Sequence, residues 1–226
     1  MSTTIDDLVE HTITIKLPSK QPIPAWEVAL LFPPQGAWSK EEYLALTDST
    51  NNLVEYTQGQ IEVLPMPTEK HQRILEFIFF IVRELMHSTG GRAFFSPLRL
   101  YIEPDRYREP DILLVVDKHD PRRADRYWSG ADLVVEIVSP DNPERDWVQK
   151  RADYARAGIP EYWIVDPQQE RIAVLRLDGD VYAEHGLFTR GEIATSVLLP
   201  DLRAVSYTHL RAHETKANLV CRLLLE

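Results

Sequence analysis

The stretch "DLVVEIVSP" (residues 132–140) places a glutamate, Glu136, in the middle of what otherwise has the composition of a buried β-strand. Because successive side chains alternate between the two faces of a strand, Val134 and Val138 share a face with Glu136, and apolar residues occupy the other face as well. Apolar residues on both faces predict a central strand that is covered on both sides. An ionised carboxylate in such a position is costly unless it is paired or binds a metal.

A second carboxylate repeats this pattern upstream. In "EPDILLVVD" (residues 109–117), Asp111 begins a predicted strand whose other members are apolar through Val116. Hard divalent cations such as Mg²⁺ prefer carboxylate oxygens, and they are usually held by one or two carboxylates together with waters and substrate phosphate. We therefore predict that Asp111 and Glu136 bind Mg²⁺ or Mn²⁺, which would activate a water and stabilise the charge of a phosphoryl group under attack.

A lysine on the following helix completes the predicted site. Asp146, Lys150 and Tyr154 recur every four residues, so they share one face of that helix. Such a helix packs back on the sheet, and we expect Lys150 to reach the strand ends. There its ammonium group would orient the attacking water or neutralise developing negative charge.

Each of these residues also has a purely structural interpretation. Asp111 can cap a turn, and Glu136 can be neutralised by a buried arginine such as Arg151. Lys150 beside Asp146 is, on its own, an ordinary surface pair worth about 0.2–0.5 kcal/mol. Only the combined pattern favours a metal site.

The segments around this site alternate between helix and strand. We predict a short helix after the N-cap Ser39, a hairpin around Gln58 and Gly59, and a long helix that follows Thr68 and ends before Gly90. A second helix, with Asn142 as its N-cap, is predicted at residues 144–157, and strands are predicted at residues 92–95, 98–102, 111–116, 133–138, 162–165, 172–177 and 181–185. This order of elements predicts an α/β fold.

Length, cysteine content and charge narrow the possible functions. The chain has 226 residues, 44% of them hydrophobic, which suits one folded domain, and Cys221 is its single cysteine, which excludes a disulfide framework. It has no apolar run of about 18 residues and no signal-peptide pattern, so we expect a cytoplasmic protein without a membrane partner. The net charge of −10 argues against a broad basic surface, so a nucleic acid would be bound locally.

Four stretches of the chain together resemble the Uma2 (DUF820) family, which is restriction-endonuclease-like and belongs to the PD-(D/E)XK nuclease superfamily. They are "LVEYTQGQIEVLPMPTEKHQRI", "EPDILLVV", "DLVVEIVSP" and "RDWVQKRADYARAGIPEYWIVDP", and the resemblance covers residues 38–202. It implies an α/β fold with a restriction-endonuclease-like mixed central β-sheet flanked by α-helices. It also implies metal-dependent cleavage of phosphodiester bonds.

The resemblance assigns residues to roles. Pro110 and Asp111 match the "PD" element of the superfamily, and Glu136 matches the acidic residue of the second element. The superfamily pattern places a lysine two residues further on, where this chain has Val138. In Uma2-like sequences a lysine on the next helix takes that role, and Lys150 occupies that place.

Two further residues match recurrent family positions. The resemblance implies that Glu55 supplies another carboxylate beside the metal, and that His71 approaches the phosphate or assists proton transfer. Taken without the resemblance, His71 has the simpler interpretation of a histidine on a helix face.

The two ends of the chain are set apart from this domain. The stretches "VSYTHLRAHET" (residues 205–215) and "LVCRLLL" (residues 219–225) are similar to translated pieces of a sequencing-library adapter, in the order in which the adapter carries them. We therefore expect residues 205–226 to be a non-native tail, although their composition also suits an amphipathic helix. We assign residues 1–37 to an N-terminal extension and residues 38–204 to the Uma2-like nuclease domain.

The residues and the resemblance together predict an Mg²⁺- or Mn²⁺-dependent endonuclease that acts on nucleic acid, with DNA as the favoured substrate. A homodimer would supply the two active sites that cutting both strands requires. Two other classes stay open. One is a binding or scaffold protein that keeps the fold but does not cleave, which the acidic net charge favours. The other is a hydrolase that acts on a non-nucleic substrate and uses Asp111 and Glu136 as a general acid/base pair without a metal.

Overall fold

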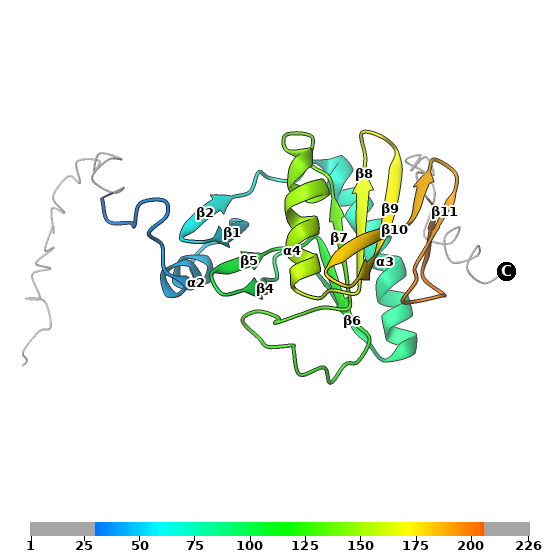
Figure 1. The fold of residues 1–226 in the computed structure, drawn as a ribbon, viewed down its shortest axis with the longest axis horizontal. Coiled ribbons are helices and arrows are strands. Elements are labelled where there is room, and N and C mark those ends of the chain that lie inside the picture. Colours follow the sequence, from blue (N-terminus) through cyan, green and yellow to red (C-terminus); the bar gives the residue numbers. More distant parts are fainter. Residues whose placement is uncertain (1–29, 206–226) are drawn as a thin grey trace, which may run out of the picture. The chain divides into compact units, whose positions relative to one another are not determined.

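The computed structural model describes residues 30–205 (Figure 1). The chain divides into two units, Met1–Pro34 and Gln35–Glu226, and the fold described here is that of the second. Most of the predicted N-terminal extension and nearly all of the predicted tail lie outside the described residues. No helix within residues 30–205 is long and apolar enough to cross a membrane.

A six-stranded sheet with the order β10-β9-β8-β7-β6-β3 forms the centre of this unit. Strands β7 and β8 run parallel, and the other neighbouring pairs are antiparallel. The predicted mixed central β-sheet of an α/β fold is therefore confirmed. Its strands are β3 (Arg92–Phe95), β6 (Ile112–Val115), β7 (Leu133–Ile137), β8 (Glu161–Asp166), β9 (Arg171–Asp178) and β10 (Val181–Thr189).

Both faces of the central sheet are covered by helices. Val135 of β7 belongs to a core cluster with side chains of α3 (Glu69–Thr89), and Val134 belongs to a separate cluster with side chains of α4 (Arg151–Arg156). Figure 1 shows α3 and α4 on opposite sides of the sheet. Every residue of β7 is buried, which confirms that Glu136 lies on a central strand covered on both sides.

A four-stranded sheet with the order β2-β1-β5-β4 forms the second part of this unit. Its β1–β2 hairpin turns at Gln58 and Gly59, where φ is 48° and 77°, as a two-residue hairpin turn requires. A Cβ atom at Gly59 would lie 2.5 Å from the carbonyl oxygen of Gly36, so no larger residue fits there. The predicted hairpin is confirmed. The strands of this sheet are β1 (Val54–Thr57), β2 (Gln60–Val63), β4 (Leu100–Glu103) and β5 (Arg106–Arg108).

Two helices begin and end at the predicted residues. Helix α2 (Lys40–Asp48) starts with a capping box, in which the Ser39 hydroxyl accepts the N–H of Glu42 and the Glu42 carboxylate accepts the N–H of Ser39. Helix α3 starts at Thr68, whose hydroxyl accepts a backbone N–H, and ends at Gly90 with φ of 86°. That left-handed conformation favours glycine.

The helix predicted at residues 144–157 differs from the prediction in its first half. Residues Arg145–Lys150 form a π-helix, η1, which continues into α4. Pro143 and Glu144 are α-helical and directly precede η1, so the helix begins after Asn142, as predicted. Asn142 accepts the N–H of Arg145 through its backbone carbonyl at 3.2 Å. Short π-helical segments are rare and are frequently found at functional sites.

Three short strands escape prediction from the sequence. They are β5, β11 (Ile193–Thr195) and β12 (Arg203–Val205), and the last two form a separate two-stranded sheet. Strand β5 has the sequence "RYR" and therefore no apolar run that would predict a strand. Its two arginines bind carboxylates that are distant in the sequence. A local pattern does not reveal such partners.

Candidate active site

The antiparallel ladder between β6 and β7 brings the two predicted metal ligands together. The ladder pairs Ile112 with Val135, and the same register continued by one residue sets Asp111 opposite Glu136. Residues directly opposite each other project from the same face, with Cβ atoms about 4.5–5.5 Å apart. The backbone N–H of Ile137 also donates to Oδ2 of Asp111 at 2.7 Å, which fixes this carboxylate against β7.

Lys150 reaches the same point from η1. Its Nζ lies 2.9 Å from Oε2 of Glu136, 3.3 Å from Oδ1 of Asp146 and 3.6 Å from Oε1 of Glu55. Only 5% of its side chain is exposed, so the interpretation as an ordinary surface pair with Asp146 is wrong. Burial lowers the pKa of Lys150, but the surrounding carboxylates outweigh it and raise the pKa well above its usual range. Lys150 is therefore a fixed cation and not a general base.

Both oxygens of the Glu136 carboxylate have donors. The Tyr154 hydroxyl donates to Oε1, and Lys150 contacts Oε2. The proposed neutralisation by Arg151 is wrong, because Nη2 of Arg151 donates to the carbonyl of Tyr182 at 2.8 Å. The face shared by Asp146, Lys150 and Tyr154, predicted from their spacing, thus meets the strand as expected.

Glu136 is the carboxyl group whose ionised form this site disfavours. Burial raises its pKa to about 8; the Lys150 charge opposes this increase, and the charges of Asp111 and Asp146 add to it. Burial and the charge of Asp111 also raise the pKa of Asp146, although Lys150 lowers it. Asp111, Glu136 and Asp146 thus repel one another around the single ammonium group of Lys150, and an additional cation would relieve their repulsion.

His71 lies in the first turn of α3 and contacts the same Asp111 oxygen that accepts the N–H of Ile137. Its Nε2 is 3.2 Å from Oδ2 of Asp111, and its backbone N–H donates to the hydroxyl of Thr68. Burial lowers the pKa of His71, but the hydrogen bond and the charge of Asp111 outweigh it, so the net pKa is raised. Its Nδ1 is buried and has no hydrogen-bond partner within the described residues.

Glu55, on β1, contacts basic side chains and does not line the pocket that contains Asp111. Its Oε2 accepts from Nη1 of Arg108 at 2.6 Å, and its Oε1 accepts the backbone N–H of Glu109 at 3.3 Å. Burial raises the pKa of Glu55, yet Lys150 and Arg108 outweigh it and lower the pKa overall. Glu55 is therefore placed to hold Lys150 from the side opposite Glu136.

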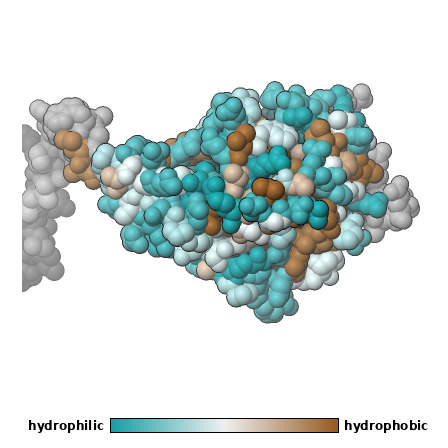
Figure 2. Space-filling model, viewed as in Figure 1, coloured by the Kyte–Doolittle hydropathy of each residue, from teal (hydrophilic) through white to brown (hydrophobic). Residues whose placement is uncertain are grey.

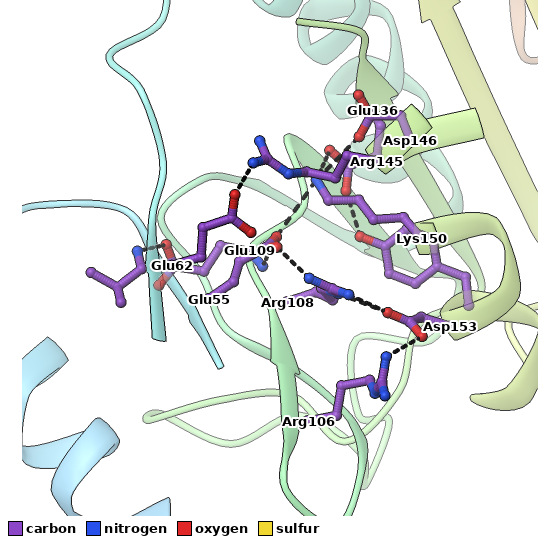
Figure 3. A network of polar contacts seen from close by, with 12 residues as sticks. Glu55, Glu62, Arg106, Arg108, Glu109, Glu136, Arg145, Asp146, Lys150 and Asp153 are labelled. Atoms are coloured by element: carbon purple, nitrogen blue, oxygen red, sulfur yellow. Dashed lines mark hydrogen bonds and ion pairs between the residues drawn. The ribbon is translucent and has the colours of Figure 1, made fainter. Parts of the chain in front are cut away.

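A buried arginine network, absent from the sequence-based prediction, supports Glu55 (Figure 3). Arg108 donates from Nε and Nη2 to Oδ2 of Asp153, at 2.8 and 2.5 Å, and Arg106 donates from Nη1 to Oδ1 of Asp153 at 2.7 Å. The one signal in the sequence is the spacing of two between Arg106 and Arg108, which puts both on one face of a strand. It does not name their partners.

Four of the five predicted site residues line one small cavity of about 50 Å³, which has room for only a few water molecules. Glu55 is the exception, since it lines a separate cavity. The charged and histidine side chains around the small cavity are Glu109, Asp111, Glu136, Asp146, His71, Arg145 and Lys150.

The residues of this cavity fit a hard divalent cation that is completed by water and substrate oxygens. Within residues 30–205, no group of three His, Cys, Asp or Glu side chains is placed to hold a metal by itself. Asp111 and Glu136 offer oxygen donors from adjacent strands, and Mg²⁺ commonly takes one or two carboxylates and keeps several waters. Oε1 of Glu136 accepts the Tyr154 hydroxyl and Oε2 pairs with Lys150, and a carboxylate oxygen has a second lone pair that could bind a metal.

Two comparisons with known proteins found matches to this chain. The family model Uma2, described as "Putative restriction endonuclease", matches residues 40–208. A crystal structure from Anabaena variabilis, described as "a putative nuclease belonging to DUF820", is 21% identical, with a TM-score of 0.58 over 72% of this chain and 93% of that chain. At this identity the likeness shows the fold alone. A search of curated proteins found no match. Because the family model matches well over half of the sequence, this chain belongs to the Uma2 family.

Proposed function

We propose that this protein is a metal-dependent endonuclease that hydrolyses phosphodiester bonds of DNA, with Asp111 and Glu136 as ligands of Mg²⁺ or Mn²⁺. The observation that carries the proposal is that two carboxylates from adjacent central strands and one buried lysine share a single cavity. Membership of a family described as "Putative restriction endonuclease" supports the nuclease class. Burial and the neighbouring carboxylates disfavour the ionised form of Glu136, and a bound cation would stabilise that form.

The bound metal would supply Lewis-acid activation of a water and of the phosphoryl oxygens. Lys150 keeps its proton, so in this proposal its ammonium group orients the attacking water or neutralises negative charge on the phosphoryl group. His71, held by Asp111, is proposed to contact the phosphate or carry a proton. Glu55 is proposed to position Lys150, since its own oxygens contact Arg108, Lys150 and a backbone N–H.

The most direct test is cleavage of supercoiled plasmid DNA in Mg²⁺ or Mn²⁺ by the parent protein and by Asp111→Asn and Glu136→Gln. We expect nicked or linear DNA from the parent and at least about a 100-fold lower rate from either variant, because a lost metal ligand should exceed the 10–100-fold effect of a lost supporting residue. No cleavage by the parent at high protein concentration would favour the scaffold interpretation. Undiminished cleavage in EDTA would contradict the proposed metal dependence.

A homodimer is the proposed assembly, because one cavity per chain serves one strand of a duplex. On the face drawn in Figure 2, hydrophilic side chains predominate and apolar side chains form small, separate groups. A better candidate for self-association is β3, an edge strand of the central sheet whose Phe94 and Phe95 are exposed, since an edge strand can pair with its own copy. Analytical ultracentrifugation would distinguish a 26.1 kDa monomer from a dimer.

A further inference from the structure

We propose that Arg145 is a phosphate-binding residue beside the carboxylate cavity, and that Glu62 holds its guanidinium group until a substrate phosphate replaces the Glu62 carboxylate. This inference deepens the proposed function, on which it rests for the identity of the phosphate as part of a nucleic acid. Neither residue is part of the predicted metal site.

The position of Arg145 gives the first argument. It is the first residue of η1, the segment that also carries Asp146 and Lys150, and its side chain lines the same cavity as Asp111 and Glu136. Only 8% of its side chain is exposed. A buried arginine in this place puts a permanent positive charge next to the bond that the proposed reaction cleaves.

The hydrogen bonds of Arg145 give the second argument. Nη2 contacts Oε1 of Glu62, whereas Nε is buried and has no hydrogen-bond partner within the described residues. A buried donor without a partner loses its hydrogen bonds to water and gains none in return. A phosphate bound along the Nε–Nη2 edge would replace the Glu62 contact and satisfy Nε as well, because the planar guanidinium group matches two phosphate oxygens at once.

The third argument is that the other basic side chains of the cavity are paired with largely buried carboxylates, whereas the partner of Arg145 is half exposed. Lys150 has three carboxylates within 4 Å, and His71 contacts Asp111. Arg145 is the remaining cation in the cavity lining, and its ion-pair partner is a carboxylate from a different element. The phosphate of a polyanion could therefore be met locally, in a chain of net charge −10.

Glu62 is suited to be displaced. It lies on β2, the edge strand of the four-stranded sheet, and 51% of its side chain is exposed. Figure 3 shows Arg145 reaching from its helix across to Glu62. The Glu62 carboxylate is already half exposed, so breaking its ion pair with Arg145 returns it to water at little cost in free energy. The Arg145 guanidinium is buried and stays beside the cavity, where it would be left unpaired unless a phosphate took the place of Glu62.

The test follows the side-chain Nε–H resonance of Arg145 by NMR during a titration with inorganic phosphate, with assignment by its absence in Arg145→Lys. We expect this resonance to shift in the parent protein, and about 10-fold less phosphate to give the half-maximal shift in Glu62→Gln. Arg190→Gln and Glu170→Gln, a matched pair at an ion pair of similar exposure to Glu62, should leave the titration unchanged. An Arg145 resonance that does not respond to phosphate in either the parent or Glu62→Gln would overturn the inference.

Plasmid cleavage separates this inference from the proposed function. We expect Arg145→Gln to raise KM for DNA at least about 10-fold and to reduce the salt dependence of DNA binding by about one phosphate contact, with partial rescue in Arg145→Lys. Equal KM values in Arg145→Gln and Arg190→Gln would overturn the inference and leave the nuclease proposal intact. A phosphate response of Arg145 in a protein that cleaves no nucleic acid would support the anion site and contradict the nuclease.

Discussion

Glu55 and Glu136 are two glutamates in equally buried positions, with exposed fractions of 1% and 2%, and both contact Lys150. Their pKa values nevertheless shift in opposite directions. The pKa of Glu55 is lowered, because Lys150 and Arg108 outweigh the effect of burial. The pKa of Glu136 is raised to about 8, because burial and the neighbouring carboxylates outweigh Lys150.

This difference distinguishes a region that we assign to folding stability from the region that we propose to be functional. In the arginine network, the buried carboxylates of Glu55 and Asp153 are matched by Arg106 and Arg108, so the charges balance. In the cavity, carboxylates outnumber the cations that contact them. An uncompensated buried charge destabilises the fold, and strongly perturbed groups cluster at functional sites. We therefore attribute folding stability to the first region and chemistry to the second.

The largest expected effect comes from breaking the balanced region. Arg108→Met leaves Glu55 and Asp153 buried without their main cation, and we expect a loss of about 3–5 kcal/mol in the free energy of unfolding. Urea denaturation followed by circular dichroism measures it. A loss below about 1 kcal/mol would mean that the arginine network does not stabilise the fold, in contradiction to the comparison of Glu55 with Glu136.

The converse variant acts on the cavity. Glu136→Gln replaces a carboxyl group whose ionised form the site disfavours and keeps the side-chain shape, so we expect the free energy of unfolding to stay within about 1 kcal/mol of the parent value, or to increase. Cleavage should fall at least about 100-fold. The same urea and plasmid assays suffice, and severe destabilisation would assign Glu136 to the structural region instead.

A smaller effect is expected from the tyrosine that orients Glu136. Tyr154→Phe removes the hydroxyl that donates to Oε1, and supporting residues of metal ligands typically change affinity or activity by about 10–100-fold. We expect Mn²⁺ affinity to fall at least about 10-fold by isothermal titration calorimetry, with α4 still folded. Unchanged affinity would show that Lys150 alone is sufficient to orient the carboxylate.

The smallest effect on the free energy of unfolding is expected at an exposed ion pair that has the same i,i+4 spacing as a buried one. Glu69 and Arg73 form an exposed i,i+4 pair on α3, whereas Asp146 and Lys150 form a buried one. Arg73→Gln should change the free energy of unfolding by only about 0.2–0.5 kcal/mol. A change above about 1 kcal/mol in urea denaturation would show that spacing, and not burial, sets the value of such a pair in this fold.

The parts of the fold that the sequence predicts are those with local causes. Strand β7 follows from apolar residues on two faces, and α3 follows from the capping residues Thr68 and Gly90. The shared helix face of Asp146, Lys150 and Tyr154 could be predicted, because their spacing of four residues is a local pattern. The approach of Lys150 to Glu136 additionally required only that a helix pack back on the strand before it.

The remaining parts depend on contacts between distant residues. Arg108 meets Glu55 across 53 residues of sequence, and Arg145 meets Glu62 across 83. No periodicity in the sequence indicates such pairs, so neither strand β5 nor the place of Arg145 in the cavity could be predicted. The π-helix η1 could not be predicted either, because residues 144–157 have the sequence pattern of an ordinary α-helix.

Calorimetric titration of Mn²⁺ and Mg²⁺ into the parent protein, Asp111→Asn, Glu136→Gln and Glu55→Gln tests the central claim most directly. We predict binding to the parent and to Glu55→Gln, and loss of binding in the two cavity variants. Absence of binding to the parent, or an equal loss in Glu55→Gln, would contradict the assignment of the surplus carboxylates to a metal site.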